Sequence, residues 1–264
     1  IEVSQALGLE WGQPVGLAFI LDGGRQAPHD WSSCTSSPAS RETTEPRTHA
    51  SVQGELWQSK IETVNRMTSQ TLVDMRVHGR FEVNNTETAP ILKGLLERGL
   101  LQLVSIMDHT PGQGQYKDVD RYLNFMHRWL GMDISVLGTS REDILERMKS
   151  NILEYAEAPR DWEVIAEVLK VAIEYGIPVS SHDDDTADKV SLQAKMGVSI
   201  SEFPVSLEAA QAAHEHGMWI VMGAPNAYRG QSTSNNLSAM DAIEAGLVDI
   251  LATDYYPAAM LHSA

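Results

Sequence analysis

Residues 177–226 read "IPVSSHDDDTADKVSLQAKMGVSISEFPVSLEAAQAAHEHGMWIVMGAPN", and their pattern decides the fold. Apolar stretches predict three short strands, at 177–185, 198–205 and 218–226, and the segments between them predict helices. The strands are apolar on both faces, and the connections are short. Such strands indicate a parallel sheet that is covered by helices.

The same alternation extends along the chain from Glu55 onward and gives six β/α units. It predicts further strands at 71–83, 101–109 and 247–257, and further helices at 55–70, 89–100, 140–176 and 235–246. Residues 22–54 are rich in Ser, Thr, Pro and Arg and predict a long loop or a disordered segment. We therefore divide the chain into an atypical N-terminal segment, 1–54, and a barrel-forming region, 55–264.

Two α/β architectures fit this alternation, a doubly wound open sheet and a (β/α)8 barrel. No predicted strand runs into a G-x-G-x-x-G turn, and the lysine motif of P-loop proteins is missing as well. Both absences weaken the nucleotide-binding open sheets. We therefore predict an α/β protein with a TIM-like (β/α)8 barrel.

The composition excludes several classes of partner. The 264 residues carry a formal net charge of −16, which disfavours binding to nucleic acid or to an anionic membrane. No apolar run approaches the roughly 20 residues that cross a bilayer. The apolar run at 15–21 lacks a basic region before it, so we expect no signal peptide. Cys34, the only cysteine, cannot form an internal disulfide, which fits a cytoplasmic protein.

Several predicted strands end in a residue that could bind a metal or act in catalysis. These residues are Glu82, His109, His182, Glu202 and Asp254. The carboxyl ends of the strands lie on one face of a parallel barrel, where the active site forms. Histidines and carboxylates that converge there make a divalent-metal site plausible.

Three aspartates follow His182 directly, in "SSHDDDT". Adjacent like charges cost free energy unless a cation lies near them. A divalent ion bound by His182 would neutralise them, with Asp183 or Asp184 orienting the ligands. For the isolated stretch, a solvated loop after a buried strand is the simpler explanation.

Two loops offer groups that suit phosphate oxygens. The loop "GAPNAYRGQSTSN" at 223–235 contains Arg229 and Ser232, and the segment that follows His109 contains Gln113 and Lys117. All four, together with Asp183, are candidate substrate-binding residues.

Five motifs resemble the PhnM family of the amidohydrolase superfamily. They read "LVSIMDHTPGQGQY", "PVSSHDDDT", "SEFPVSLEAA", "MGAPNAYRGQSTSNN" and "DILATDYYPAAMLHSA", and the resemblance covers roughly residues 55–264. That family acts in phosphonate catabolism as an α-D-ribose 1-methylphosphonate 5-triphosphate diphosphatase. The resemblance implies a barrel of the metal-dependent hydrolase type that holds one or two divalent ions. Zinc is the ion that it implies.

The resemblance also implies roles for single residues. Glu82 matches the bridging carboxylate, and His109 and His182 match the histidine ligands. Asp254 matches the aspartate that binds metal and takes the proton from the attacking water. A small phosphorylated molecule would be the substrate, and hydrolysis at its α-phosphorus would release pyrophosphate.

Part of the family pattern is missing. Residues 7–24 contain no His-x-His or His-x-Asp motif, and the chain stops where family members continue with a helix and further strands. We therefore expect a chain truncated at both ends and an incomplete barrel, in which residues 14–22 fill a strand that is otherwise missing. Exposed apolar edges would then favour a homo-oligomer or poor solubility.

Two other functions stay open. A barrel without the first-strand ligands could be catalytically impaired and serve as a binding or scaffold protein. Alternatively, the chain could hydrolyse a C–N bond, which is the usual chemistry of the superfamily.

Overall fold

The computed structural model describes residues 15–22, 58, 61–67, 69, 74–83, 86–108, 114, 160–232 and 236–252. Seven parallel strands form one sheet, in the order in which they occur along the chain. They are β1 (Val15–Asp22), β2 (Asp74–Glu82), β3 (Leu103–Met107), β4 (Val179–His182), β5 (Ile200–Glu202), β6 (Trp219–Gly223) and β7 (Ile250–Ala252). Strands β2 to β7 lie within the six predicted strands, and β1 is the apolar stretch considered as a further strand.

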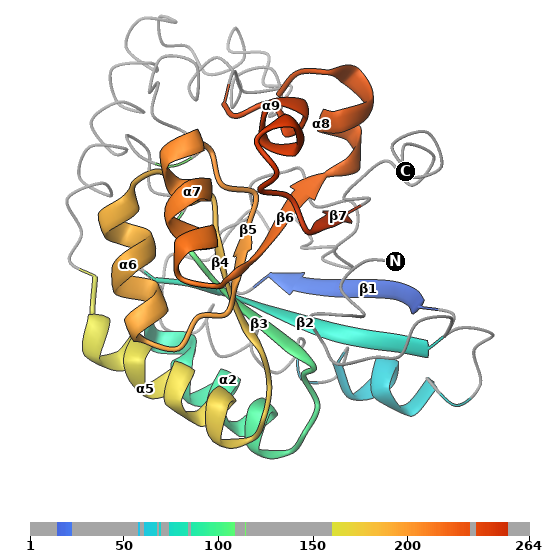
Figure 1. Ribbon diagram of the computed structural model, residues 1–264. Coiled ribbons are helices and arrows are strands. Elements are labelled where there is room, and N and C mark those ends of the chain that lie inside the picture. Colours follow the sequence, from blue (N-terminus) through green and yellow to red (C-terminus); the bar gives the residue numbers. More distant parts are fainter. Residues whose placement is uncertain are drawn as a thin grey trace, which may run out of the picture.

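The strand order separates the two architectures that fitted the sequence. A doubly wound sheet reverses its strand order at one point, and the ligand binds there. This sheet shows no reversal from β1 to β7, and it curls so that one face is turned inward (Figure 1). A curled parallel sheet in sequential order is part of a β/α barrel. The prediction of an α/β fold with an incomplete barrel is confirmed to this extent.

Helices cover the outer side of the sheet (Figure 1). They are α2 (Ala89–Glu97), preceded by the 3-10 turn η2 (Thr86–Thr88), α5 (Trp162–Glu174), α6 (Ala187–Lys195), α7 (Leu207–Glu215), α8 (Ala224–Arg229) and α9 (Ala239–Glu244). Four of them begin at a side chain that accepts a hydrogen bond from a backbone N–H of the first turn: Asp161, Thr186, Ser206 and Ser238. Each such cap stabilises a helix by about 1 kcal/mol. None of the helices described is long and apolar enough to span a bilayer.

Helix α8 corrects the sequence prediction. We expected a strand as far as Asn226 and a loop over 223–235, but the strand ends at Gly223 and a helix follows at once. Pro225 lies in the first turn, where its missing N–H costs nothing, and Gly230 ends the helix in the left-handed conformation (φ 69°). Arg229 is therefore the last residue of a helix and not part of a loop.

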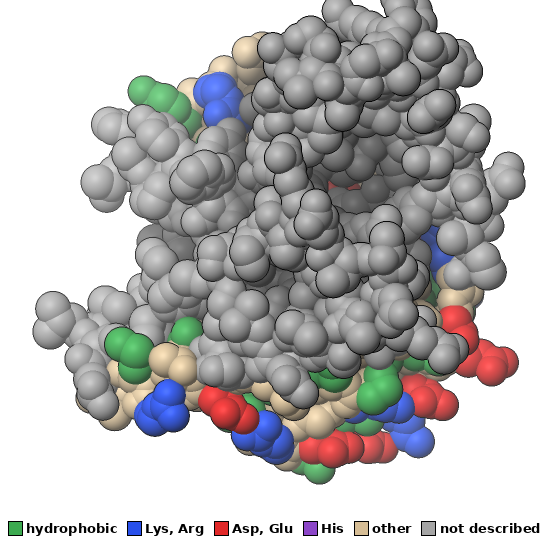
Figure 2. Space-filling view, turned by 180° about the vertical axis from the view of Figure 1, so that it is seen from behind, with side chains coloured by type: hydrophobic (Ala, Val, Ile, Leu, Met, Phe, Trp, Pro, Cys, Tyr) green, Lys and Arg blue, Asp and Glu red, His purple; other side chains and the backbone are tan. Residues whose placement is uncertain are grey.

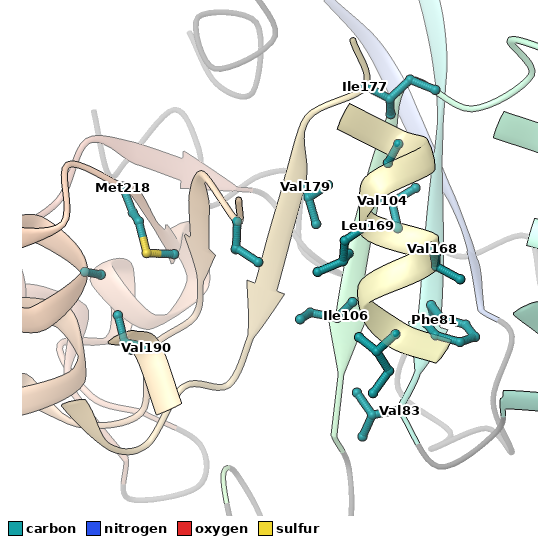
Figure 3. Close-up of a cluster of buried hydrophobic side chains, with 14 of the residues drawn as sticks. Phe81, Val83, Val104, Ile106, Val168, Leu169, Ile177, Val179, Val190 and Met218 are labelled. Carbon is teal, nitrogen blue, oxygen red and sulfur yellow. The ribbon is translucent and has the colours of Figure 1, made fainter. Parts of the chain in front are cut away.

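Side chains alternate between two faces along each strand. On the outer face, Val104, Ile106 and Val179 pack beneath α5 against Val168 and Leu169 (Figure 3). All of these side chains are buried. This layer attaches the helices to the sheet.

The opposite side of the sheet, which we call the inner face, has a smaller apolar cluster made of Leu103, Ile200, Val221 and Ile250. The inner face is polar where it is formed by β2 to β4 and by the end of β5. Its buried polar residues are His78, Arg80 and Glu82 on β2, Ser105 on β3, and Ser180 and His182 on β4, and the partly buried Glu202 follows on β5. Polar and apolar residues therefore lie side by side on this face, since Ser180 is the register partner of Ile200 and Glu202 that of Val221.

The outer surface is solvated by charges of both signs. Figure 2 shows basic and acidic side chains intermixed along its lower edge, on the side where α2 and α5 lie in Figure 1. Lys93 of α2 binds Glu167 of α5 at 2.8 Å, and Arg98 binds Glu62 at 2.6 Å. Exposed pairs of this kind contribute at most about 1 kcal/mol each.

Candidate active site

Three of the predicted strand-end residues lie at one edge of the sheet. Glu82, His182 and Glu202 are the last residues of β2, β4 and β5, as the sequence predicted. Glu82 and His182 are buried, with 4% and 8% of their surface exposed, so neither is a solvated strand end. His109 and Asp254 lie outside the described residues, and their place at this edge stays a prediction.

His182 and Glu202 form a hydrogen-bonded pair. They are direct neighbours in the parallel register of β4 and β5, and His182 Nδ1 lies 2.9 Å from Glu202 Oε2. A carboxylate only accepts hydrogen bonds, so Nδ1 carries the proton and Nε2 of the neutral ring keeps its lone pair. Phe203 contacts the imidazole edge-on, with 5.5 Å between the ring centroids. The ring is thereby fixed in orientation and in tautomer.

Arg80 is a site residue that the sequence analysis missed. Its Nη2 lies 3.2 Å from His182 Nε2, and its Nε donates to Met107 Sδ at 2.6 Å. Its only sequence clue is the spacing of two residues from Glu82, which places both on the inner face. The guanidinium, the imidazole and the Glu202 carboxylate therefore form a continuous polar chain.

His78 lies deeper on the same strand. Its Nε2 is 2.9 Å from Ser105 Oγ of β3. Burial lowers the pKa of His78, and the Glu202 carboxylate opposes this shift. His78 is therefore a neutral hydrogen-bonding group within the inner face of the sheet.

The aspartates after His182 point to three different places. The carboxylate of Asp184 lies on the outer face, where it accepts hydrogen bonds from Ser181 Oγ and, at 2.7 Å, from Ser201 Oγ. Burial raises the pKa of this carboxyl, and the charge of Lys189 and the serine hydroxyls oppose the shift. Of the two aspartates predicted to orient a metal ligand, Asp184 thus binds the serines on the outer face and ties β4 to β5.

Asp183 and Asp185 complete the turn after β4. Asp183 has a left-handed backbone (φ 53°), and its N–H donates to the carbonyl oxygen of Glu202 at 3.0 Å. Its Oδ2 lies 3.8 Å from His182 Nε2, so Asp183 does adjoin the predicted ligand. Asp185 Oδ2 accepts from the N–H of Gly114 at 3.1 Å. The three consecutive aspartates thus repel one another little, because their carboxylates point in different directions.

An ion pair lies at the end of the neighbouring strand. Arg160 Nε donates to Asp108 Oδ2 at 2.6 Å, and Asp108 directly follows β3. The carboxylate is 5% exposed and the arginine side chain 23%. This pair therefore anchors the start of α5 to the edge of the sheet that carries Glu82 and His182.

The remaining substrate candidates are less enclosed. Arg229 is exposed at the end of α8, and Ser232 is half-buried two residues after the helix cap Gly230. Gln113 and Lys117 lie outside the described residues. A role of these four residues beside His182 and Glu202 stays a prediction.

The donor set suits a divalent ion in part. Glu82 and His182 have the right chemistry, and a carboxylate on the far nitrogen of a histidine is the usual support of a metal ligand. Among the described residues, no group of three or more His, Cys, Asp or Glu is placed to hold an ion. A complete site therefore needs the predicted ligands His109 and Asp254. Arg80 on His182 Nε2 is the feature that does not fit.

A sequential parallel β/α sheet with polar residues at the carboxyl ends of its strands defines the architecture of the β/α-barrel proteins. No family model matches the chain. The chain is 35% identical over 189 residues to the alpha-D-ribose 1-methylphosphonate 5-triphosphate diphosphatase of Escherichia coli (strain K12). The match covers 72% of this chain and 48% of the relative, so the chain spans about half the length of that enzyme. The predicted resemblance is confirmed, and the chain is PhnM-like over the matched residues.

Proposed function

We propose that this protein is a metal-dependent hydrolase of phosphonate catabolism, which cleaves α-D-ribose 1-methylphosphonate 5-triphosphate and releases pyrophosphate. The observation that carries the proposal is the 35% identity to the diphosphatase over 189 residues. The polar residues at the carboxyl ends of β2, β4 and β5, of which Glu82 and His182 are buried, support it, because a barrel enzyme binds its substrate at this edge.

We assign the metal to Glu82, His109, His182 and Asp254, with zinc as the expected ion and one or two ions per site. A divalent ion in this place would lower the pKa of water towards about 7 and neutralise phosphate charge. The barrel would be of the metal-dependent hydrolase type over residues 55–264. Glu202 would hold the imidazole of His182 in the tautomer that leaves Nε2 available.

In the proposed reaction a water oxygen forms a bond to the α-phosphorus, and the bond from that phosphorus to the bridging oxygen breaks. Pyrophosphate leaves with the bond's electrons, and Asp254 takes the proton of the water. Asp183, Arg229, Ser232, Gln113 and Lys117 are the side chains proposed to bind the substrate. The single cysteine supports a cytoplasmic location, and we propose a homo-oligomer that binds neither nucleic acid nor membrane.

Pyrophosphate release from the ribosyl triphosphate tests this function. The full chain should release pyrophosphate in a reaction that a chelator stops and zinc restores. Asp254→Asn should abolish the release with little change in stability, because asparagine keeps the shape of aspartate but cannot take the proton. Turnover by Asp254→Asn at close to the parent rate would refute the catalytic assignment. Release of ammonia or a carboxylate from a cyclic imide, without pyrophosphate release, would favour C–N bond hydrolysis instead.

A further inference from the structure

Arg80 occupies the nitrogen of His182 on which the proposed metal site depends. The guanidinium is buried on the inner face, where Arg80 is 6% exposed, and its Nη2 lies 3.2 Å from His182 Nε2. The arginine comes from β2 and the histidine from β4, so the contact joins two strands separated by β3.

The chemistry of the two groups makes this contact exclusive. Glu202 accepts the proton of Nδ1, which leaves a single in-plane lone pair on His182 Nε2. Arginine stays protonated in proteins and only donates hydrogen bonds. One lone pair cannot accept a guanidinium N–H and bind a cation at the same time.

We propose that Arg80 and a divalent cation bind His182 Nε2 alternately. Cation binding displaces the guanidinium, and loss of the cation lets it return. Arg80 thus keeps a buried imidazole paired in the metal-free protein and lowers the apparent affinity for the metal. The inference rests on the proposed function in one respect, that His182 is a metal ligand.

Zinc titration calorimetry on the chelator-treated full chain tests the competition. Arg80→Met keeps an unbranched side chain beside Met107 and removes the donor. We expect this variant to bind zinc about tenfold more tightly or better, because the competing charge-assisted hydrogen bond is gone. The matched control is Arg160→Met, which removes a positive charge at the same edge that is held by Asp108 and not by His182. It should change the zinc affinity by less than about threefold.

The double variant Arg80→Met/His182→Ala separates competition from general repulsion. If the two groups compete, the double variant should bind zinc no more tightly than His182→Ala alone. The proposal is overturned if Arg80→Met binds zinc no more tightly than the parent, or if Arg160→Met raises the zinc affinity as much as Arg80→Met does. It is also overturned if Arg80→Met still raises the zinc affinity in a protein that lacks His182.

Nitrogen-15 NMR of the imidazole in the unsubstituted protein gives a second measurement, which does not depend on a variant that folds. Zinc should move the Nε2 resonance of His182 from its hydrogen-bonded position to a metal-bound one, and the Arg80 guanidinium resonances should move in the same titration. Movement of Nε2 without any change at Arg80 would refute the exchange.

The same titrations separate this proposal from the proposed function. If His182→Ala binds zinc as tightly as the parent does, His182 is no metal ligand. Both the proposed metal site and the competition with Arg80 are then wrong. If His182→Ala loses zinc while Arg80→Met equals the parent, only the competition fails.

Discussion

His182 Nδ1 and Glu202 Oε2 lie 2.9 Å apart because the two residues are direct register partners at the ends of adjacent strands. The spacing of parallel strands, about 4.8 Å, brings side chains on the same face into hydrogen-bonding range. The pairing of β4 with β5 therefore sets the imidazole tautomer.

Glu202→Gln should weaken zinc binding about 10–100-fold, since the carboxylate that orients the ligand is replaced by an amide. Zinc titration measures the change, and thermal unfolding checks that the fold is kept. The exposed Glu215→Gln, at the end of α7, is the matched control and should bind zinc like the parent. An unchanged affinity in Glu202→Gln would show that the carboxylate does not support a ligand.

Asp184→Ala should destabilise the protein by about 2–4 kcal/mol, because two buried serine hydroxyls lose their acceptor. Urea unfolding measures the loss. Asp184→Asn keeps an oxygen that can accept from both serines and should lose less than half as much. Equal losses in the two variants would mean that the charge matters more than the hydrogen bonds.

His78 should make stability depend on pH. Burial lowers the pKa of His78 in the folded state, so the unfolded chain takes up the proton first as the pH falls. This stability is fully present above the unfolded pKa of about 6.5 and is lost as the pH falls below it, by up to about 1.4 kcal/mol per pH unit. Urea unfolding of the parent and of His78→Gln between pH 8 and 5.5 should show a shallower decline in the variant. If the free energy of unfolding fell equally with pH in the parent and in His78→Gln, His78 would not be the source of the pH dependence.

Gly79→Val should destabilise the protein by about 1–3 kcal/mol through overpacking. A Cβ at this position would lie 3.0 Å from Leu101 Cδ1 and 3.4 Å from Leu92 Cδ1, both behind the sheet. Gly94→Ala is the control, since a Cβ there meets nothing within 4 Å and the residue lies inside α2. It should raise the free energy of unfolding by up to about 1 kcal/mol. Urea unfolding of both variants gives the comparison.

Asp108→Asn should loosen the start of α5, because Arg160 loses its charged partner at 2.6 Å. The carboxylate is nearly buried, so we expect a loss of about 1–3 kcal/mol in the free energy of unfolding. Hydrogen exchange should be faster in the first turn of α5 than at its end. Uniform protection along the helix would contradict the anchoring role.

Much of the fold could be read from local pattern. The strands β2 to β7 and the helices α2, α5, α6, α7 and α9 fall where apolar periodicity predicted them. Polar residues at the ends of β2, β4 and β5 were visible as well, since each follows an apolar run directly. Helix α8 was not, because Ala224 and Pro225 continue the apolar run of β6 although Pro225 is suited to a first helical turn.

The sequence by itself determined the parallel β/α alternation, the strand ends that carry Glu82, His182 and Glu202, and the relationship to the diphosphatase. Only the tertiary structure decided which groups meet. Arg80 and His182 are 102 positions apart, and Asp184 turns away from His182 although it follows two residues later. Local periodicity depends on neighbours along the chain, whereas these contacts depend on strand register and on the alternation of side chains between the two faces of the sheet.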